Sequence, residues 1–174
     1  MERSQRRPTD LDARQIAVRV GDDEILVSWH APNMPPEGQA HGAEGICVTD
    51  TADVVVISRD GRRWELPAGR REHGETWEQT LRREVREEAC ATVVRARLLG
   101  FSRGEYVAGR QSGTVLVRSI WRADVTVDPW DPRHEIPFRR VMPAAEIEGA
   151  LDIARHPFAP IVRRALHEAG VAEC

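Results

Sequence analysis

The sequence predicts an α/β fold, and three observations indicate that class. Stretches rich in β-branched residues, which are typical of strands, lie before and after residues 76–89. Residues 76–89 have apolar side chains at helical spacing and begin with a capping motif. Two stretches near the end of the chain, 147–153 and 161–169, also have helical patterns. Strands and helices in this arrangement are typical of the α/β class.

The N-terminal part predicts a flexible tail and then a β-hairpin. Residues 1–12 are polar and highly charged, which is typical of a tail. Residues 16–29 read as two strands around a Gly-Asp-Asp turn at 21–23. We expect residues 13–174 to form one domain that includes this hairpin as an extension. The Pro- and Gly-rich segment 31–42 is then expected to be a loop.

The next segments predict two strands and a tight turn. Residues 45–48 and 54–58 are mostly apolar and rich in β-branched residues. Asp60 and Gly61 mark a tight turn, which leads into residues 62–66.

The main helix is predicted to begin at Thr76, which is a good N-cap. Gln79 stands three residues later and completes a capping box. The apolar stripe of Leu81, Val85 and Ala89 should pack on the sheet. The opposite, acidic face should then lie at the edge of the core, where it meets a cleft.

Two long strands are predicted after the helix, over residues 93–101 and 115–127. The Gly-rich segment 104–113 between them is expected to be a loop. Residues 128–137 contain three prolines and predict a second loop.

Length and composition indicate a soluble cytoplasmic protein. The chain has 174 residues, enough to bury a core without cross-links. Its formal net charge of -3 is mild, so we expect neither nucleic acid nor membrane as a partner. Three widely spaced cysteines favour a reduced protein over a disulfide framework. The 25 basic side chains are all arginine, which suits bidentate phosphate contacts.

Residues 69–91 gather acidic side chains in one loop and one helix. Glu84, Glu87 and Glu88 stand at i, i+3 and i+4 and therefore share a helix face. Like charges at this spacing repel, and near a helix C-terminus they also face the negative end of the helix dipole. A bound cation would remove both penalties. Mg²⁺ is the natural candidate because it prefers oxygen ligands, with Mn²⁺ as the alternative. An ordinary solvated helix face is the competing interpretation.

The same stretch resembles the Nudix hydrolase box. That box reads Gly, five residues, Glu, seven residues, Arg-Glu, an aliphatic residue, any residue, Glu-Glu, any residue, Gly and an aliphatic residue. The matching residues are Gly69, Glu75, Arg83, Glu84, Val85, Glu87 and Glu88. The match fails at Cys90, which replaces the second glycine. That glycine suits a left-handed helix cap, so either Cys90 accepts a strain of about 1 kcal/mol or the helix ends differently.

The resemblance implies an α/β/α sandwich with a mixed sheet, and a hydrolase of phosphoanhydride bonds. In this family the arginine that matches Arg83 orients a carboxylate, while Glu75 would contact the metal site or brace the loop. The implied metal ligands are Glu84, Glu87, Glu88 and the backbone carbonyl of Gly69. A metal ion there would polarise phosphoryl oxygens and lower the pKa of a bound water.

A general base is expected outside the box, because some family members use a glutamate from a later loop. Glu135 is the candidate, since its surroundings resemble that segment of the family. The alternative is a rim carboxylate paired with Arg139 or Arg140.

The candidate substrate-binding residues lie in or directly before the segment predicted to be a loop after the box. They are Arg103, Tyr106 and Arg110. Tyr106 lies near the position where dinucleoside polyphosphate hydrolases carry a tyrosine. A core aromatic and two solvated arginines are the competing interpretation.

The leading hypothesis is a Mg²⁺-dependent Nudix hydrolase that cleaves a nucleoside diphosphate linked to another moiety. A nucleotide sensor of the same fold is the second. An isomerase of isopentenyl diphosphate is the third, but it needs a reactive cysteine, and neither Cys47 nor Cys90 obviously serves. The exposed N-terminal hairpin raises the further hypothesis of a homodimer.

Overall fold

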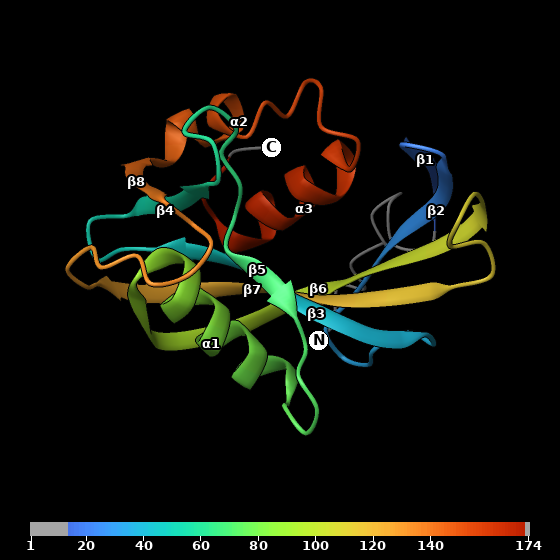
Figure 1. Ribbon diagram of the computed structural model, residues 1–174, viewed down its shortest axis with the longest axis horizontal. Coiled ribbons are helices and arrows are strands. Elements are labelled where there is room, and N and C mark those ends of the chain that lie inside the picture. The colour runs from blue at the N-terminus through green and yellow to red at the C-terminus, as the bar shows by residue number, and fades with distance from the viewer. Residues whose placement is uncertain (1–13, 173–174) are drawn as a thin grey trace, which may run out of the picture.

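The computed structural model describes residues 14–172, which form a mixed eight-stranded sheet with helices on both faces (Figure 1). The predicted tail over residues 1–12 lies outside the described residues. The strands are β1 (Ile16–Val20), β2 (Asp23–His30), β3 (Gln39–Val48), β4 (Asp53–Ser58), β5 (Ala68–Arg70), β6 (Ala91–Ala108), β7 (Val115–Val127) and β8 (Phe138–Pro143). The helical segments are α1 (Trp77–Ala89), the 3₁₀ turn η1 (Ala144–Glu146), α2 (Ile147–Ala150) and α3 (Ala159–Ala169).

The sheet has the strand order β1-β2-β6-β7-β3-β4-β8, and β5 pairs with β3 beside this path. Strands β3 and β7 run parallel, whereas the other pairs are antiparallel. The sheet is therefore mixed, as predicted.

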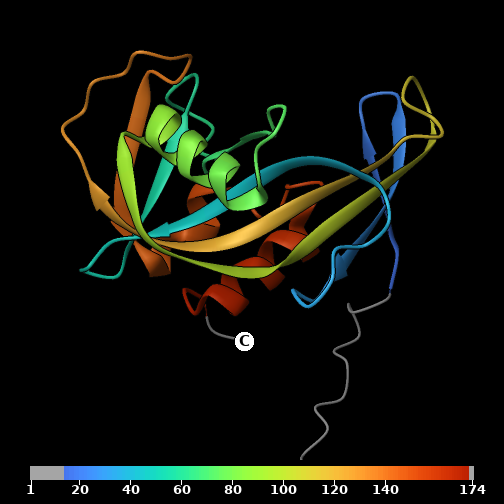
Figure 2. The ribbon, with the colours of Figure 1, turned by 90° about the horizontal axis from the view of Figure 1, so that it is seen from below.

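Helices α1 and α3 cover opposite faces of the sheet, as Figure 2 shows from below. Leu81, Val85 and Ala89 of α1 pack with Ala43 and Cys47 of β3 in one buried cluster. The other cluster contains the α3 residues Ile161, Val162, Ala165, Leu166 and Ala169. Successive side chains of a strand point to opposite faces, so one strand supplies both clusters. The predicted α/β/α sandwich is confirmed.

Two predicted loops are wrong in part. Within 31–42, β3 already begins at Gln39, and within 104–113, β6 continues to Ala108. Gly104 lies in a strand that pairs with β2 on one side and β7 on the other. Ladder hydrogen bonds on both sides offset the low strand propensity of glycine, which is why a local pattern misplaced these boundaries.

Two other predicted elements are shorter than expected. Residues 62–66 form no strand beyond a single bridge between Ile57 and Glu65. Within 147–153, only the first four residues form α2. Helix α3 ends where predicted, with Gly170 in the left-handed conformation at φ 72°.

The N-terminal hairpin is built into the main sheet. Strands β1 and β2 pair with each other, and β2 then pairs along β6 from Glu24 to His30. Within residues 14–172, no helix is long and apolar enough to cross a membrane.

Candidate active site

The helix that carries the acidic residues begins where the capping motif predicts. The Thr76 hydroxyl accepts a hydrogen bond from the Gln79 backbone N–H at 3.2 Å. The Gln79 side chain in turn accepts one from the Thr76 N–H at 2.7 Å. This pair satisfies two of the N–H groups that a helix start leaves without partners, so the first turn of α1 is well defined.

The helix ends at Cys90, which adopts the left-handed conformation at φ 45° and ψ 56°. Cys90 therefore accepts the strain that the missing glycine would have avoided. The Arg139 guanidinium secures this exit by donating to the carbonyls of Ala89 and Cys90 at 2.9 and 2.8 Å. It also donates to the carbonyl of Asp128 at 2.9 Å.

Glu84 lies directly against the backbone of β5. Its side chain is almost fully buried, and a Cβ added to Gly69 would overlap its carboxyl group. Only a glycine at position 69 lets the strand approach the carboxylate this closely. The glycine of the motif therefore provides space for Glu84.

The carbonyl of Gly69, which the resemblance implies as a metal ligand, lies beside β3. Gly69 pairs with Ala43 of β3, and a Cβ added to Gly42 would overlap the Gly69 carbonyl oxygen. That oxygen therefore lies close to the backbone of the neighbouring strand.

Arg83 links four acceptors around the acidic face. Its guanidinium donates to both oxygens of Glu75 at 2.8 and 3.0 Å and to Glu84 at 2.7 Å. It also donates to Glu87 at 3.3 Å and to the carbonyl of Arg70 at 2.8 Å. The predicted function of orienting a carboxylate fits this geometry, because the planar guanidinium fixes several oxygens at once.

Glu75 braces the loop before α1. Hydrogen bonds from Arg83 lower the pKa of its carboxyl to about 2, and the Glu72 N–H and the Thr80 hydroxyl add to the effect. Both latter groups donate to the Glu75 carboxylate at 2.9 Å. Glu75 therefore stays ionised and ties the loop to the helix.

Glu88 and Glu84 have the opposite electrostatic environment. Burial raises the pKa of Glu88 to about 7 and also raises that of Glu84. Glu88 accepts one hydrogen bond from the Ala68 N–H at 2.9 Å, and Arg59 lies 3.6 Å away. Glu84 accepts a hydrogen bond from Arg83 at 2.7 Å. These contacts only partly offset the loss of water, so the ionised form of both carboxylates is disfavoured.

Metal binding is consistent with the chemistry of this face. Among the described residues, no three His, Cys, Asp or Glu side chains are grouped so that they could hold an ion as they stand. The donors nevertheless suit a hard divalent cation, because three carboxylates share one helix face and two of them are buried without full charge compensation.

Glu135 is connected to the acidic face through Arg59. Its side chain is 85% exposed and accepts a hydrogen bond from Arg59 at 2.8 Å. The expected alternative partners, Arg139 and Arg140, lie elsewhere, over the rings of Trp130 and Trp64. Arg59 thus bridges Glu135 and Glu88.

The three predicted substrate-binding residues do not share one loop. Arg103 and Tyr106 are in strand β6, and only Arg110 lies in a loop. Arg103 pairs with Glu105 at 3.0 Å, and Arg110 lies 3.5 Å from Asp22. Tyr106 packs against the core, and none of the three lines the pocket described next.

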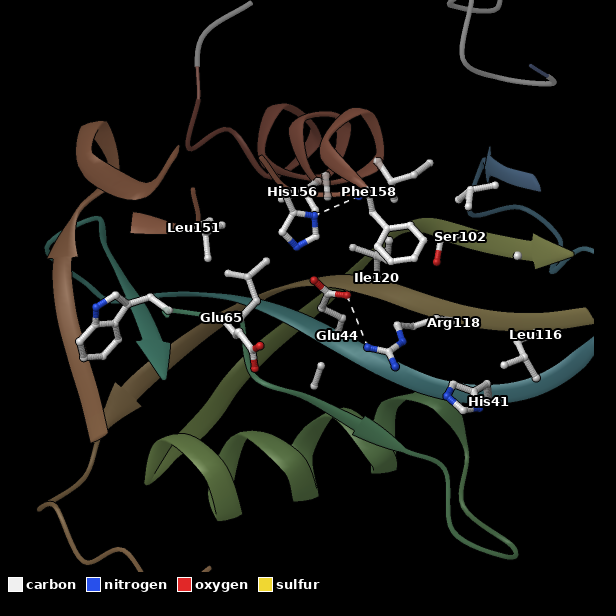
Figure 3. A pocket seen from close by; sticks show the side chains of 18 residues that line it. His41, Glu44, Glu65, Ser102, Leu116, Arg118, Ile120, Leu151, His156 and Phe158 are labelled. Carbon is white, nitrogen blue, oxygen red and sulfur yellow. Dashed lines mark hydrogen bonds and ion pairs between the residues drawn. The ribbon is translucent and has the colours of Figure 1, made fainter. Parts of the chain in front are cut away.

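A pocket of about 290 Å³ opens on the α3 face of the sheet (Figure 3). Its floor includes Glu44 of β3 and Arg118 of β7, and its opposite wall includes His156 and Phe158. Ala68 of β5 borders it, and the same residue donates its N–H to Glu88. The pocket therefore adjoins the carboxylates of α1.

The sequence interpretation missed these lining residues, although two of them left a signal. Glu44 stands just before an apolar strand segment, and Arg118 interrupts an apolar, β-branched run. A charged residue inside such a strand indicates a polar partner or a ligand-facing site. Nothing comparable marks Phe158, because an aromatic residue before a helix is usually part of the core.

A protein-family model for the NUDIX domain matches residues 39–171. The chain belongs to the Nudix family. The predicted family and its hydrolase activity on pyrophosphate bonds are thereby confirmed. No curated protein sequence matches the chain significantly.

Several solved structures share the Nudix fold with this chain. The Bacillus subtilis pyrophosphohydrolase BsRppH is 20% identical with a TM-score of 0.67, over 92% of this chain and 99% of that one. A MutT structure from work on the Aliivibrio salmonicida and Vibrio cholerae proteins is 19% identical with a TM-score of 0.53. The match covers 74% of this chain and 97% of that one. A NUDIX hydrolase from Nitrosomonas europaea is 20% identical with a TM-score of 0.57. The match covers 74% of this chain and 89% of that one. At these identities the likeness concerns the fold.

Proposed function

We propose that this Nudix protein is a Mg²⁺-dependent pyrophosphohydrolase of a nucleoside diphosphate linked to another moiety, with Mn²⁺ as an alternative ion. The supporting observation is the acidic face of α1, where Glu84 and Glu88 are buried and nearby arginines offset their loss of water only in part. A bound divalent cation would supply further positive charge, polarise phosphoryl oxygens and lower the pKa of a water.

The side chains around this face have distinct functions in the proposal. Glu84, Glu87 and Glu88 hold the ion. Arg83 positions the first two of these, since it donates to both carboxylates, and Glu75 holds Arg83. Removing such a supporting group usually weakens a metal site by about 10–100-fold.

Glu135 is the proposed general base. The Arg59 guanidinium lies 2.8 Å from the Glu135 carboxylate and 3.6 Å from that of Glu88. Glu135 is therefore close enough to reach a water bound near Glu88. Glu135 would accept the proton of this water as it attacks phosphorus in line.

The pocket on the other side of β5 is the proposed site for the rest of the substrate. Its residue Ala68 donates to Glu88, so one backbone segment borders both sites. A nucleoside in the pocket would therefore direct its phosphates past Ala68 to the carboxylates.

The test is hydrolysis of nucleoside triphosphates, nucleotide sugars, ADP-ribose and dinucleoside polyphosphates with and without Mg²⁺. We expect Mg²⁺-dependent turnover, and a loss of about 10²-fold or more in kcat in Glu87→Gln, as for other groups that stabilise transition-state charge. Glu78→Gln is the matched control, because Glu78 lies on the same helix and pairs with Arg82. Nucleotide binding without turnover of any substrate would instead favour the sensor.

A further inference from the structure

We propose that the pocket beside β5 selects a guanine base and that Glu44 and Arg118 read its edge. This inference rests on the proposed function, because it assigns the nucleoside that the pocket holds.

The two charged residues stand on the same face of the sheet. In the parallel pairing of β3 and β7, Glu44 lies opposite Ile120, and Arg118 lies opposite Gly42. Residues two apart in a strand share a face, so Glu44 and Arg118 both point to the α3 side together with Ile120. Figure 3 shows them side by side below His156 and Phe158.

The pair retains hydrogen-bonding capacity for a ligand. The Glu44 carboxylate and the Arg118 guanidinium are 3.7 Å apart, which is beyond hydrogen-bond distance. Their side chains are 23% and 31% exposed, so each still reaches the pocket. Much of the remaining lining is apolar and includes Leu66, Leu116 and Ile120. Glu65, His41 and His156 also line the pocket, but Glu44 and Arg118 form its adjacent pair of opposite charges. Such a pair defines an orientation for a polar ligand.

Guanine has the edge that matches this pair most completely. It presents the O6 acceptor beside two donors, N1–H and the 2-amino group. A carboxylate takes both donors with its two oxygens, while an arginine donates to O6, a contact that is common in base recognition. Adenine presents only one donor group on this edge, next to the N1 acceptor, which a carboxylate repels. Glu44 therefore gains two charge-assisted hydrogen bonds with guanine and one with adenine.

The opposite wall supplies an aromatic surface for the base. Phe158 precedes α3, and its ring centroid lies 6.1 Å from that of His156. The His156 Nδ1 accepts a hydrogen bond from the Phe158 backbone N–H at 3.1 Å, which holds the imidazole against the chain beside Phe158. Stacking of a base on an aromatic ring tolerates any base, so the discrimination lies with Glu44 and Arg118.

The experiment is calorimetric titration of metal-free protein with GMP, IMP and AMP. We expect GMP to bind at least about 10-fold more tightly than AMP, and IMP to lie between them because it lacks the 2-amino group. Glu44→Gln should remove the preference for GMP. Glu105→Gln is the matched control, since Glu105 also pairs with an arginine on this sheet and should leave the preference unchanged.

Three outcomes would overturn the inference. They are equal affinity for GMP and AMP, no measurable binding of GMP, and an equal loss for all three nucleotides in Glu44→Gln. Hydrolysis assays with Mg²⁺ separate this result from the proposed function. Turnover of all bases alike contradicts only the guanine selectivity, whereas GMP-selective binding without any hydrolysis contradicts only the pyrophosphohydrolase.

Discussion

The absence of a side chain at position 69 shapes the proposed site as much as the carboxylates do. Gly69 is the residue against which the Glu84 carboxyl group packs, and Gly42 in turn makes room for the Gly69 carbonyl. Two successive close approaches place β3, β5 and α1 in contact. A glycine in the motif is thus required by packing, apart from any contact with a metal.

Gly69→Ala should impair the enzyme through Glu84. The added Cβ overlaps the buried carboxyl group, so we expect turnover to fall by about 10-fold or more and the free energy of unfolding by about 1–3 kcal/mol. Kinetics and thermal unfolding measure both effects. Gly149→Ala is the control, because a Cβ there meets nothing within 4 Å. Equal behaviour of the two variants would contradict this role of Gly69.

Cys90→Gly should stabilise the protein. Cys90 has φ 45°, a conformation that costs a residue with a Cβ about 0.5–1 kcal/mol relative to glycine. For a chain of this size the gain corresponds to a rise of about 1–4 °C in Tm. Cys90→Ala keeps the strain and should show no such rise. A lower Tm for Cys90→Gly would show that the contact of its thiol with the Asp131 carbonyl outweighs the strain.

At the scale of elements, the loop before α1 and the helix form one unit through Glu75 and Arg83. Two hydrogen bonds join these side chains, and Thr80 on the first turn donates to the same carboxylate. The helix therefore carries both the proposed metal ligands and the residue that positions them.

Glu75→Gln should weaken this unit in a pH-dependent way. The folded pKa of Glu75 is about 2, below the value near 4.5 of an unfolded glutamate, so its ionised form favours folding. That contribution is complete above pH 5 and is lost as the pH falls toward 2. Unfolding experiments should therefore find a destabilised variant at pH 7 and a difference that shrinks toward pH 2. A difference independent of pH would argue against an ionic brace.

The elements that could be predicted are those defined by local interactions. The capping box places the start of α1, because the two hydrogen bonds involve residues only three apart. Strand bounds near Gln39 and Ala108 could not be predicted, because they depend on pairing with strands far away in the sequence. The glycines near these bounds indicate a loop, but pairing within the sheet outweighs this local preference.

At the scale of the whole molecule, the site too could be predicted only where local interactions define it. The carboxylates of α1 could be predicted because one helix aligns them. The pocket could not, since Glu44, Arg118 and Phe158 come from three distant segments that only the folded sheet and α3 bring together. Arg103 and Tyr106 lie in strand β6 and not in a loop for a related reason, because β6 is longer than its local pattern indicates.

The proposed metal site should also couple to global stability. The pKa of Glu88 is raised to about 7, above the ordinary value of 4.5, so its ionised form opposes folding. Metal-free protein should therefore lose stability as the pH rises from 4.5 through 7, by on the order of 1–3 kcal/mol. Glu88→Gln should remove most of this loss, although it should also remove activity.

The most direct test of a metal site on α1 is thermal unfolding at pH 8 with and without Mg²⁺, for the wild type and Glu88→Gln. Without metal, the variant should melt at the higher temperature, because it has no buried charge at position 88. Mg²⁺ at a hundredfold Kd should stabilise the wild type by about 2.7 kcal/mol and leave the variant almost unchanged. If Mg²⁺ leaves the wild type unchanged, or raises the Tm of both proteins equally, the carboxylates of α1 are not its binding site.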